Sequence, residues 1–370
     1  MLKKNSKSYN LFIASELLHE SAGNPRQWRQ LENYKSLEIP IIVLTIDSWR
    51  WRLFKPSELE NKKTNLSNFG NRGRKFFLIR LMRFIKQDLM MEFFTFKAWT
   101  LYWLILKVYL SKDIKKVYIS SPPFPGFSAI LGFLGKNYEI DMRDPWALHP
   151  TLAKFSWARK HLEKFIFSRA NIVSVATKFM AKKIFDEYKI DSRVEYNFPN
   201  TSAEEFSNPT DAELSNLDEQ FKLATNDSSI KTLTYCGTTP DEFYDLTKIG
   251  NILKDALSKE YELRIFFIGT SKVFTELKDL EDEGRVNYIS RVSRKESILY
   301  LRQSDFVMFF GHKFDGYLTT KIFEYMALKK RIIPIDLDEK YEAFDLIEEY
   351  GQPKSKINTG LDLINYYKLI

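Results

Sequence analysis

Short apolar runs alternate with amphipathic segments along the first half of the chain, and this pattern predicts parallel strands joined by helices. Each run is four to nine residues long and is rich in Ile, Val, Leu or Phe, as strands buried on both faces are. The predicted strands are residues 10–15, 39–47, 117–121, 139–142 and 172–176. The predicted helices are residues 24–36, 75–110, 127–134, 156–169 and 178–188.

The alternation stops at a polar, acidic stretch and then starts again. Residues 204–230 contain few large apolar side chains, so we interpret them as a linker region. Beyond the stretch, the predicted strands are residues 232–236, 262–268, 286–289, 305–310 and 331–335. Helices are predicted at residues 246–257, 294–302 and 320–328. The last residues, 354–370, are predicted to form a helix that packs back toward the N-terminal domain.

Two such series predict an α/β protein with two Rossmann-like, doubly wound parallel-sheet domains. We place the N-terminal domain at residues 1–203 and the C-terminal domain at residues 231–353. A chain of 370 residues, 44% of them hydrophobic, is long enough for two cores of this size. Ligands of such sheets bind beyond the carboxyl ends of the strands, and the cleft between two facing domains is the expected site.

Cysteine and histidine are scarce. One cysteine excludes an internal disulfide and argues against a Cys-based metal site, and the four histidines are too scattered for a zinc motif. We expect no metal site, and we expect no cofactor. Residues 10–15 are too short an apolar run for a signal peptide. Residues 98–110, about 13 in number, fall short of the roughly 20 needed to span a bilayer. We therefore expect a cytoplasmic protein, at most peripheral on the inner face of the membrane.

Charge is distributed unequally along the chain. Residues 1–200 carry 34 Lys and Arg against 18 Asp and Glu, a net of +16, and the remaining residues carry 22 against 30, a net of −8. The basic half indicates an anionic partner such as a phospholipid surface, a lipid diphosphate or a nucleic acid, unless it is simply a solvated, lysine-rich surface. No nucleic-acid motif accompanies the charge, so we expect no nucleic-acid partner. The basic, aromatic-rich residues 75–110 are the candidate contact with an anionic membrane; buried core with surface lysines is the alternative.

Lys321 and Glu324 stand near the start of a predicted helix, directly after Thr319 and Thr320. The two charged residues are three apart, so they share a face. Lys321 supplies a point charge for a diphosphate, and Glu324 can accept hydrogen bonds from the two hydroxyls of a ribose. The alternative is that Glu324 only complements the helix dipole and that Lys321 is solvated.

Other candidates follow predicted strands. Gly237 and Thr238 come directly after one strand and Gly269 after the next, where glycine lets the backbone approach a ligand. A turn that merely requires glycine is the alternative at both glycines.

The N-terminal half offers a loop and a strand end for the acceptor or for phosphate. Gly23 precedes a predicted helix that has Arg26 in its first turn, an arrangement that can hold a phosphate. Arg143 and Asp144 end a predicted strand, where Asp144 could orient a hydroxyl. The alternative for Asp144 is pairing with Arg143 or capping of a turn.

Several motifs together resemble the retaining GT-B glycosyltransferases of the large family four, also called glycosyl transferases group 1. They are residues 141–146 (DMRDPW) after residues 120–123 (SSPP), residues 162–177, the region of Asn197, and residues 320–327 (TKIFEYMA). The resemblance implies donor binding by the C-terminal domain, acceptor binding by the N-terminal domain, and retention without a metal. Glu324 matches the second glutamate of the family's E-x7-E pattern, whereas Gly316 replaces the first glutamate.

The resemblance also implies the activity. We expect a bacterial-type hexosyltransferase that moves a sugar from a UDP- or GDP-sugar to a lipid-linked or oligosaccharide acceptor. The expected role is the synthesis of a surface polysaccharide such as capsule, O-antigen (the lipopolysaccharide side chain) or exopolysaccharide. Lys321, together with Lys248 or Arg26, would stabilise the departing diphosphate. Two alternatives are a nucleotide-sugar epimerase and, because of Gly316, a non-catalytic nucleotide-sugar-binding protein.

Overall fold

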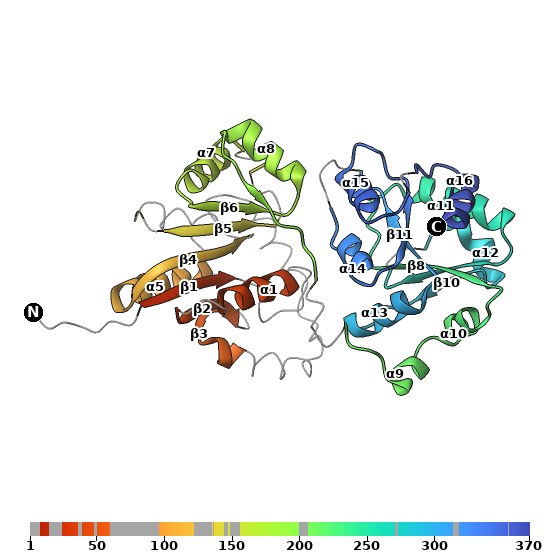
Figure 1. Ribbon diagram of the computed structural model, residues 1–370, viewed down its shortest axis with the longest axis horizontal. Coiled ribbons are helices and arrows are strands. Elements are labelled where there is room, and N and C mark those ends of the chain that lie inside the picture. The colour runs from red at the N-terminus through yellow and green to blue at the C-terminus, as the bar shows by residue number, and fades with distance from the viewer. Residues whose placement is uncertain are drawn as a thin grey trace, which may run out of the picture. The chain divides into compact units, whose positions relative to one another are not determined.

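A computed structural model describes thirteen stretches of the chain, which fall into two compact units. The stretches are residues 8–14, 24–35, 39–47, 50–59, 96–121, 135, 137–143, 147–148, 156–199, 206–270, 273–313, 318–353 and 355–370. The two units are Met1–Asn197 and Phe198–Ile370 (Figure 1).

The first unit contains a seven-stranded sheet in the order β3-β2-β1-β4-β5-β6-β7. All neighbouring strands are parallel except β3, which runs antiparallel to β2 at the edge of the sheet. The strands are β1 (Ser8–Ala14), β2 (Ile41–Asp47), β3 (Arg50–Phe54), β4 (Asp113–Ser121), β5 (Tyr138–Met142), β6 (Ile172–Val175) and β7 (Arg193–Val194). The edge strand β3 was not predicted, because its sequence RWRLF mixes charged and aromatic residues.

Helices cover both faces of this sheet, because successive residues of a strand point to opposite faces. On one face, Phe12 packs with Trp28 and Leu31 of α1 (Asn24–Lys35). On the other face, Leu11 and Ile13 share a core with side chains of α5 (Phe96–Ser111), α7 (Ser156–Phe167) and α8 (Lys178–Tyr188). The helix predicted at residues 127–134, and residues 75–95 of the predicted long helical region, lie outside the described residues.

The second unit contains a five-stranded, fully parallel sheet in the order β10-β9-β8-β11-β12. The strands are β8 (Lys231–Cys236), β9 (Leu263–Ile268), β10 (Val286–Ile289), β11 (Phe306–Phe310) and β12 (Arg331–Ile335). The helices are α9 (Asp211–Ser215), α10 (Glu219–Asn226), α11 (Leu246–Lys259), α12 (Lys278–Asp282), α13 (Arg294–Gln303), α14 (Lys321–Ala327), α15 (Glu342–Glu349) and α16 (Gly360–Leu369), with a 3₁₀ turn at Thr275–Leu277.

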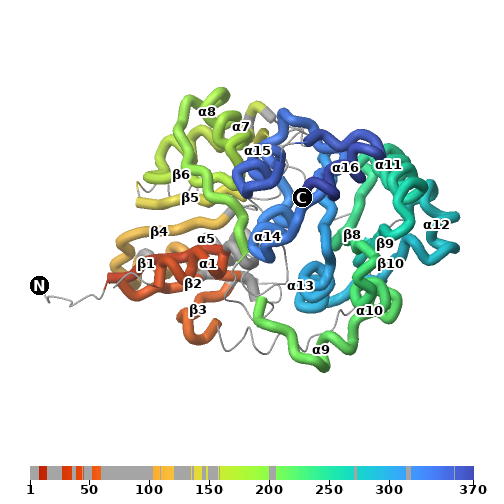
Figure 2. The backbone as a smooth tube through the Cα atoms, turned by 45° about the vertical axis from the view of Figure 1, so that its right-hand side comes forward, coloured from red at the N-terminus to blue at the C-terminus, as the bar shows by residue number. Residues whose placement is uncertain are grey.

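The two faces of the second sheet also have separate cores. Leu233 and Ile265 pack with Leu253 of α11 and Leu363 of α16, and Figure 2 shows these two helices side by side. The opposite face carries Phe266, which packs with residues of α10 and α13. The strand–helix alternation therefore places the carboxyl ends of all five strands along one edge.

The segment interpreted as a linker, residues 204–230, is mostly folded as part of the second unit, so that interpretation is wrong. Its described part forms α9 and α10, and Phe221 of α10 is fully buried against Phe266 and Tyr300. The Tyr300 hydroxyl accepts a hydrogen bond from the Asp218 amide at 2.8 Å. The composition was misleading because one buried aromatic side chain anchors an otherwise polar helix.

The C-terminal helix was predicted, and its buried side packs on the second sheet. The amide of Gly360 donates to the Asp255 carboxylate of α11 at 3.0 Å, and Leu363 and Tyr366 join the core that lines the second sheet. The buried side of α16 thus belongs to the core of the C-terminal unit. Within the described residues, no helix is both long and apolar enough to cross a bilayer.

Candidate nucleotide-binding site

Two glycines end neighbouring strands at the carboxyl edge of the second sheet. Gly237 follows β8 and donates its amide to the Ile268 carbonyl at 2.8 Å, and Gly269 follows β9 and donates to the Ile289 carbonyl at 2.9 Å. Their φ angles are +130° and +72°, a region that side-chain-bearing residues rarely adopt. The local backbone therefore requires glycine at both predicted positions. This supports the alternative interpretation that each turn simply needs a glycine.

Gly237 has a second reason to be glycine, because Lys321 lies directly over it. A Cβ atom added at Gly237 would lie 2.6 Å from Lys321 Cε and 2.7 Å from Nζ. The ammonium also stands 5.4 Å from the centre of the Tyr235 ring, which suits a cation–π contact. The fold thus brings together two predicted site residues that are far apart in the sequence.

The charge of Lys321 is not neutralised by an ion pair within the described residues. Burial lowers the pKa of its ammonium group, and the neighbouring Glu324 carboxylate and Cys236 thiol oppose that shift. In the described part of the chain, no acidic side chain lies within ion-pair distance of Lys321. The neighbouring Glu324 forms its ion pair with Arg294 instead. A half-buried cation without a carboxylate partner is suited to receive an anion from outside.

Glu324 forms an ion pair with Arg294, a residue that the sequence analysis did not identify as part of the site. Arg294 Nη1 lies 2.8 Å from Glu324 Oε1, and only 16% of the glutamate side chain is exposed. Arg294 opens α13, which follows β10 and is capped by Ser293 and Glu296 in a capping box. That capping box was a visible signal for a helix start at this edge, although the pairing itself depends on the fold.

Lys248 has a carboxylate partner of its own. Its ammonium pairs with Asp336, which follows β12 and has a φ angle of +54°. A role for Lys248 in phosphate binding would have to break this pair, so the structure favours Lys321 as the cation of the site.

The threonines of the site fall into two groups. Thr238 is exposed beside Gly237, while the buried hydroxyls of Thr239 and Thr270 have no hydrogen-bond partner in the described part of the protein. Thr319 is half-buried, and Thr320 starts α14 without a side-chain cap. Because α14 has only seven residues, its dipole is small, and attraction for an anion depends mainly on Lys321.

The predicted acceptor residues lie mostly outside the described part of the chain. Gly23, Asp144 and Gly316 are not among the described residues, and neither is the side chain of Arg26, although its backbone belongs to α1. Arg143 directly follows β5 and is half-buried. The assignment of these residues to the acceptor therefore stays a prediction.

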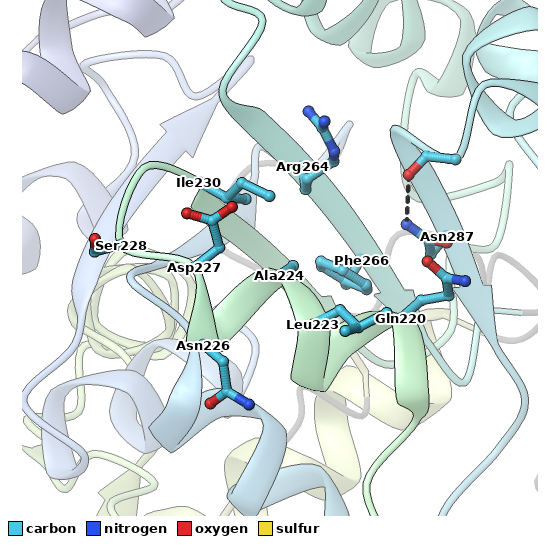
Figure 3. A pocket seen from close by; sticks show the side chains of 11 residues that line it. Gln220, Leu223, Ala224, Asn226, Asp227, Ser228, Ile230, Arg264, Phe266 and Asn287 are labelled. Atoms are coloured by element: carbon cyan, nitrogen blue, oxygen red, sulfur yellow. Dashed lines mark hydrogen bonds between the residues drawn. The ribbon is translucent and has the colours of Figure 1, made fainter.

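Two hollows in the second unit lie apart from Gly237. One, of about 600 Å³, opens at the amino ends of β8, β9 and β10, where Leu223 and Ala224 of α10 stand over Phe266 (Figure 3). Its Arg264 side chain is bonded to the backbone carbonyls of Tyr261 and Leu263. The other, of about 430 Å³, lies between α11 and the start of α16 and includes Lys248.

Comparison with known proteins identifies the fold but no family. No protein-family model matches the sequence, and no curated protein matches it. The solved structures that match include trehalose-6-phosphate synthase OtsA (12% identity, TM-score 0.56, covering 99% of this chain and 92% of that one) and a structure titled as trehalose-6-phosphate from E. coli bound with UDP-2-fluoro glucose (12%, 0.55, 98% and 92%). A third is UDP-GlcNAc 2-epimerase from Methanocaldococcus jannaschii (11%, 0.51, 98% and 92%).

These similarities extend over nearly the whole chain and therefore include both units. The two parallel-sheet α/β domains confirm the predicted GT-B class of fold. At 11–12% identity the similarity establishes the fold alone, because one fold hosts several chemistries.

Proposed function

We propose that this protein is a glycosyltransferase whose second unit binds a nucleoside-diphosphate sugar. The observation that carries the proposal is the Lys321 ammonium, held against Gly237 at the carboxyl edge of the sheet with no ion-pair partner in the described part of the chain. A diphosphate would supply the missing negative charge. Two of the structures with the same fold are titled as complexes with UDP or a UDP-sugar, which supports a ligand of this class.

Lys321 would act most strongly on the departing diphosphate. As the bond between the anomeric carbon and the phosphate oxygen breaks, negative charge grows on the leaving group, and a fixed cation stabilises that charge more than it stabilises the ground state. The acceptor hydroxyl forms the new bond to the anomeric carbon. Its proton passes to the departing phosphate oxygen, and Asp144 orients the hydroxyl.

Glu324 would hold the ribose of the donor. Arg294 bonds one oxygen of its carboxylate and fixes the orientation of the group. A carboxylate has about four acceptor positions, so the two ribose hydroxyls can donate to it while the ion pair persists. Arg294 is therefore a positioning residue for the proposed donor site.

The finer details of the reaction extend this proposal. The donor is a UDP- or GDP-sugar, transfer proceeds with retention and without a metal, and the acceptor is lipid-linked or an oligosaccharide. The product belongs to a surface polysaccharide, and the enzyme works in the cytoplasm. The motif resemblance around residues 141–146 and 320–327 supports these points.

A nucleotide-sugar epimerase is the second candidate. UDP-GlcNAc 2-epimerase structures share the fold over most of their length, which keeps this reaction open. An epimerase converts a nucleotide sugar without an acceptor, whereas a transferase releases free nucleoside diphosphate only when an acceptor is present. Incubation of the protein with each nucleotide sugar alone separates the two reactions.

Glu324→Ala tests the donor site, with nucleotide affinity measured by calorimetry across a panel of nucleoside diphosphates and their sugars. Loss of the ribose contacts should weaken binding by about tenfold or more, since hydrogen bonds to a charged group contribute about 1.5–3 kcal/mol. Glu219→Ala is the matched control, because Glu219 is also a glutamate in the first turn of a helix of the same unit. Equal affinity of the two variants would refute the ribose assignment.

A further inference from the structure

Helix α5 is apolar on its buried side and also on its exposed side. Its sequence, FKAWTLYWLILKVYLS, contains two lysines and no acidic residue. Ile105 and Val108 are buried in the core against the first sheet. Trp103, Leu106 and Leu110 are instead exposed by 66%, 46% and 79%.

The three exposed side chains form one continuous stripe. They are spaced three and then four residues apart, so they lie along a single line on the helix surface. A surface helix normally presents polar residues on that side, and a helix that is apolar all round is typical of protein cores and membranes. The exposed line of Trp103, Leu106 and Leu110, which we call the α5 stripe, therefore calls for an apolar environment.

Basic residues border the α5 stripe. Lys107 and Lys112 are exposed, and Lys115 is exposed as well, with Asp113 3.1 Å from its ammonium. The surrounding half of the chain has a net charge of +16 over residues 1–200 (34 minus 18). An apolar line bordered by lysines matches the boundary of an anionic bilayer, where acyl chains meet negative headgroups.

We propose that the α5 stripe rests on an anionic phospholipid surface. Trp103 and the two leucines enter the boundary between headgroups and acyl chains, and Lys107 and Lys112 contact lipid phosphates. Tryptophan favours this boundary because its ring is largely apolar and its N–H is polar. The inference rests on the proposed function in one respect, since a lipid-linked acceptor is presented at such a surface.

Vesicle co-sedimentation without nucleotide tests the proposal on the full chain. The probes are phosphatidylcholine vesicles with and without phosphatidylglycerol, at low and high salt. The wild-type protein should sediment with the anionic vesicles, and less so at high salt, because salt screens the lysines. Leu110→Asp should lower the partition coefficient by about tenfold or more, the equivalent of the burial of one leucine.

Leu369→Asp is the matched control. Leu369 is 68% exposed and, like Leu110, stands in the last turn of its helix, but it belongs to α16 of the other unit. Its variant should sediment as the wild type does. Leu106→Gln serves as a second variant if Leu110→Asp fails to fold, and it should also weaken sedimentation.

Three results would overturn the proposal. They are absence of wild-type binding to anionic vesicles, an equal loss in the Leu369→Asp control, and a dimer in solution that Leu110→Asp dissociates, which would mean that a second copy covers the stripe. Leu110→Asp should keep wild-type nucleotide affinity. Loss of nucleotide binding by the wild type itself, with vesicle binding intact, would refute the proposed function alone.

Discussion

At the scale of single residues, the contact between Gly237 and Lys321 determines where the positive charge of the candidate site lies. The glycine is needed both for its φ angle of +130° and for the space that the lysine side chain fills. The lysine in turn keeps its charge close to the Tyr235 ring and has no carboxylate partner in the described part of the chain. Each residue has an ordinary local role, and only their apposition suggests anion binding.

Gly237→Ala should weaken nucleotide binding by about tenfold, because the new methyl group would displace the Lys321 ammonium and cost part of a charged contact. Calorimetry with the best-binding nucleotide measures the effect. Gly284→Ala is the control, since Gly284 also has a positive φ angle, +69°, but open space around its Cβ position. If both variants bind like the wild type, Lys321 does not contact the nucleotide.

His312 predicts a pH dependence of stability. It is buried between the rings of Phe243 and Tyr244, at centroid distances of 4.9 Å and 5.3 Å, and burial lowers its pKa to about 4. In the unfolded chain its pKa is about 6.5, so between these values the unfolded state binds more protons than the folded one. Its contribution to stability is thus complete above about pH 6.5 and falls as the pH drops toward 4.

The expected loss over that range is at most about 3 kcal/mol, from roughly 1.4 kcal/mol for each pKa unit. Urea unfolding at several pH values would measure it. His312→Phe keeps a ring between Phe243 and Tyr244 and should flatten the slope, while His161→Gln, at an exposed histidine, should leave it unchanged. A wild-type slope that persists in His312→Phe would rule out this histidine as its source.

At the scale of elements, α10 shows how one side chain converts a polar segment into part of a domain. Phe221 is fully buried between Phe266 and Tyr300, whereas Leu223 of the same helix is 60% exposed. The helix thus depends on a single aromatic anchor. Without that contact, residues 219–226 would bury little apolar surface against the sheet.

Phe221→Ala should lower the free energy of unfolding of the second unit by about 3–5 kcal/mol, because it leaves a cavity in a closed core. Urea unfolding followed by circular dichroism measures the loss. Leu223→Ala is the control within the same helix and should cost less than about 1 kcal/mol. A similarly small cost for Phe221→Ala would restore the linker interpretation.

Most strands of both sheets could be predicted, and the reason is physical. Parallel strands buried on both faces are continuous apolar runs, and β10 and β12 matched their predicted bounds. The edge strand β3 escaped because an edge strand tolerates charged residues such as Arg50 and Arg52. The polar helix α10 was not predicted because Phe221 is its only aromatic residue and the rest of its sequence is mostly polar.

The site was predictable residue by residue but not in its pairings. Gly237, Lys321 and Glu324 stood out because of their places at strand and helix ends. Lys248 and Asp336 are 88 positions apart, and no local sequence pattern predicts an ion pair at that separation. The Arg294–Glu324 pair likewise joins the first turns of two different helices, α13 and α14, so only the fold reveals it.

At the scale of the whole molecule, the two halves of the chain differ in charge and in proposed task. The basic first half carries the α5 stripe, and the acidic second half carries, among its described residues, a cation without a carboxylate partner at its strand ends. The proposed function therefore depends above all on Lys321.

Lys321→Met tests that dependence most directly. Methionine fills similar space without a charge, so it removes a partly desolvated cation and should leave stability equal or higher. Lys330→Met is the matched control, since burial also lowers the pKa of Lys330, but its ammonium donates to the Arg302 carbonyl at 2.8 Å.

Calorimetric titration with UDP and GDP is the decisive measurement. We predict that the wild-type protein and Lys330→Met bind one of these nucleotides with similar affinity, and that Lys321→Met binds it at least about tenfold more weakly while staying folded. Equal affinity in Lys321→Met, or no nucleotide binding by the wild-type protein, would contradict the proposed donor site.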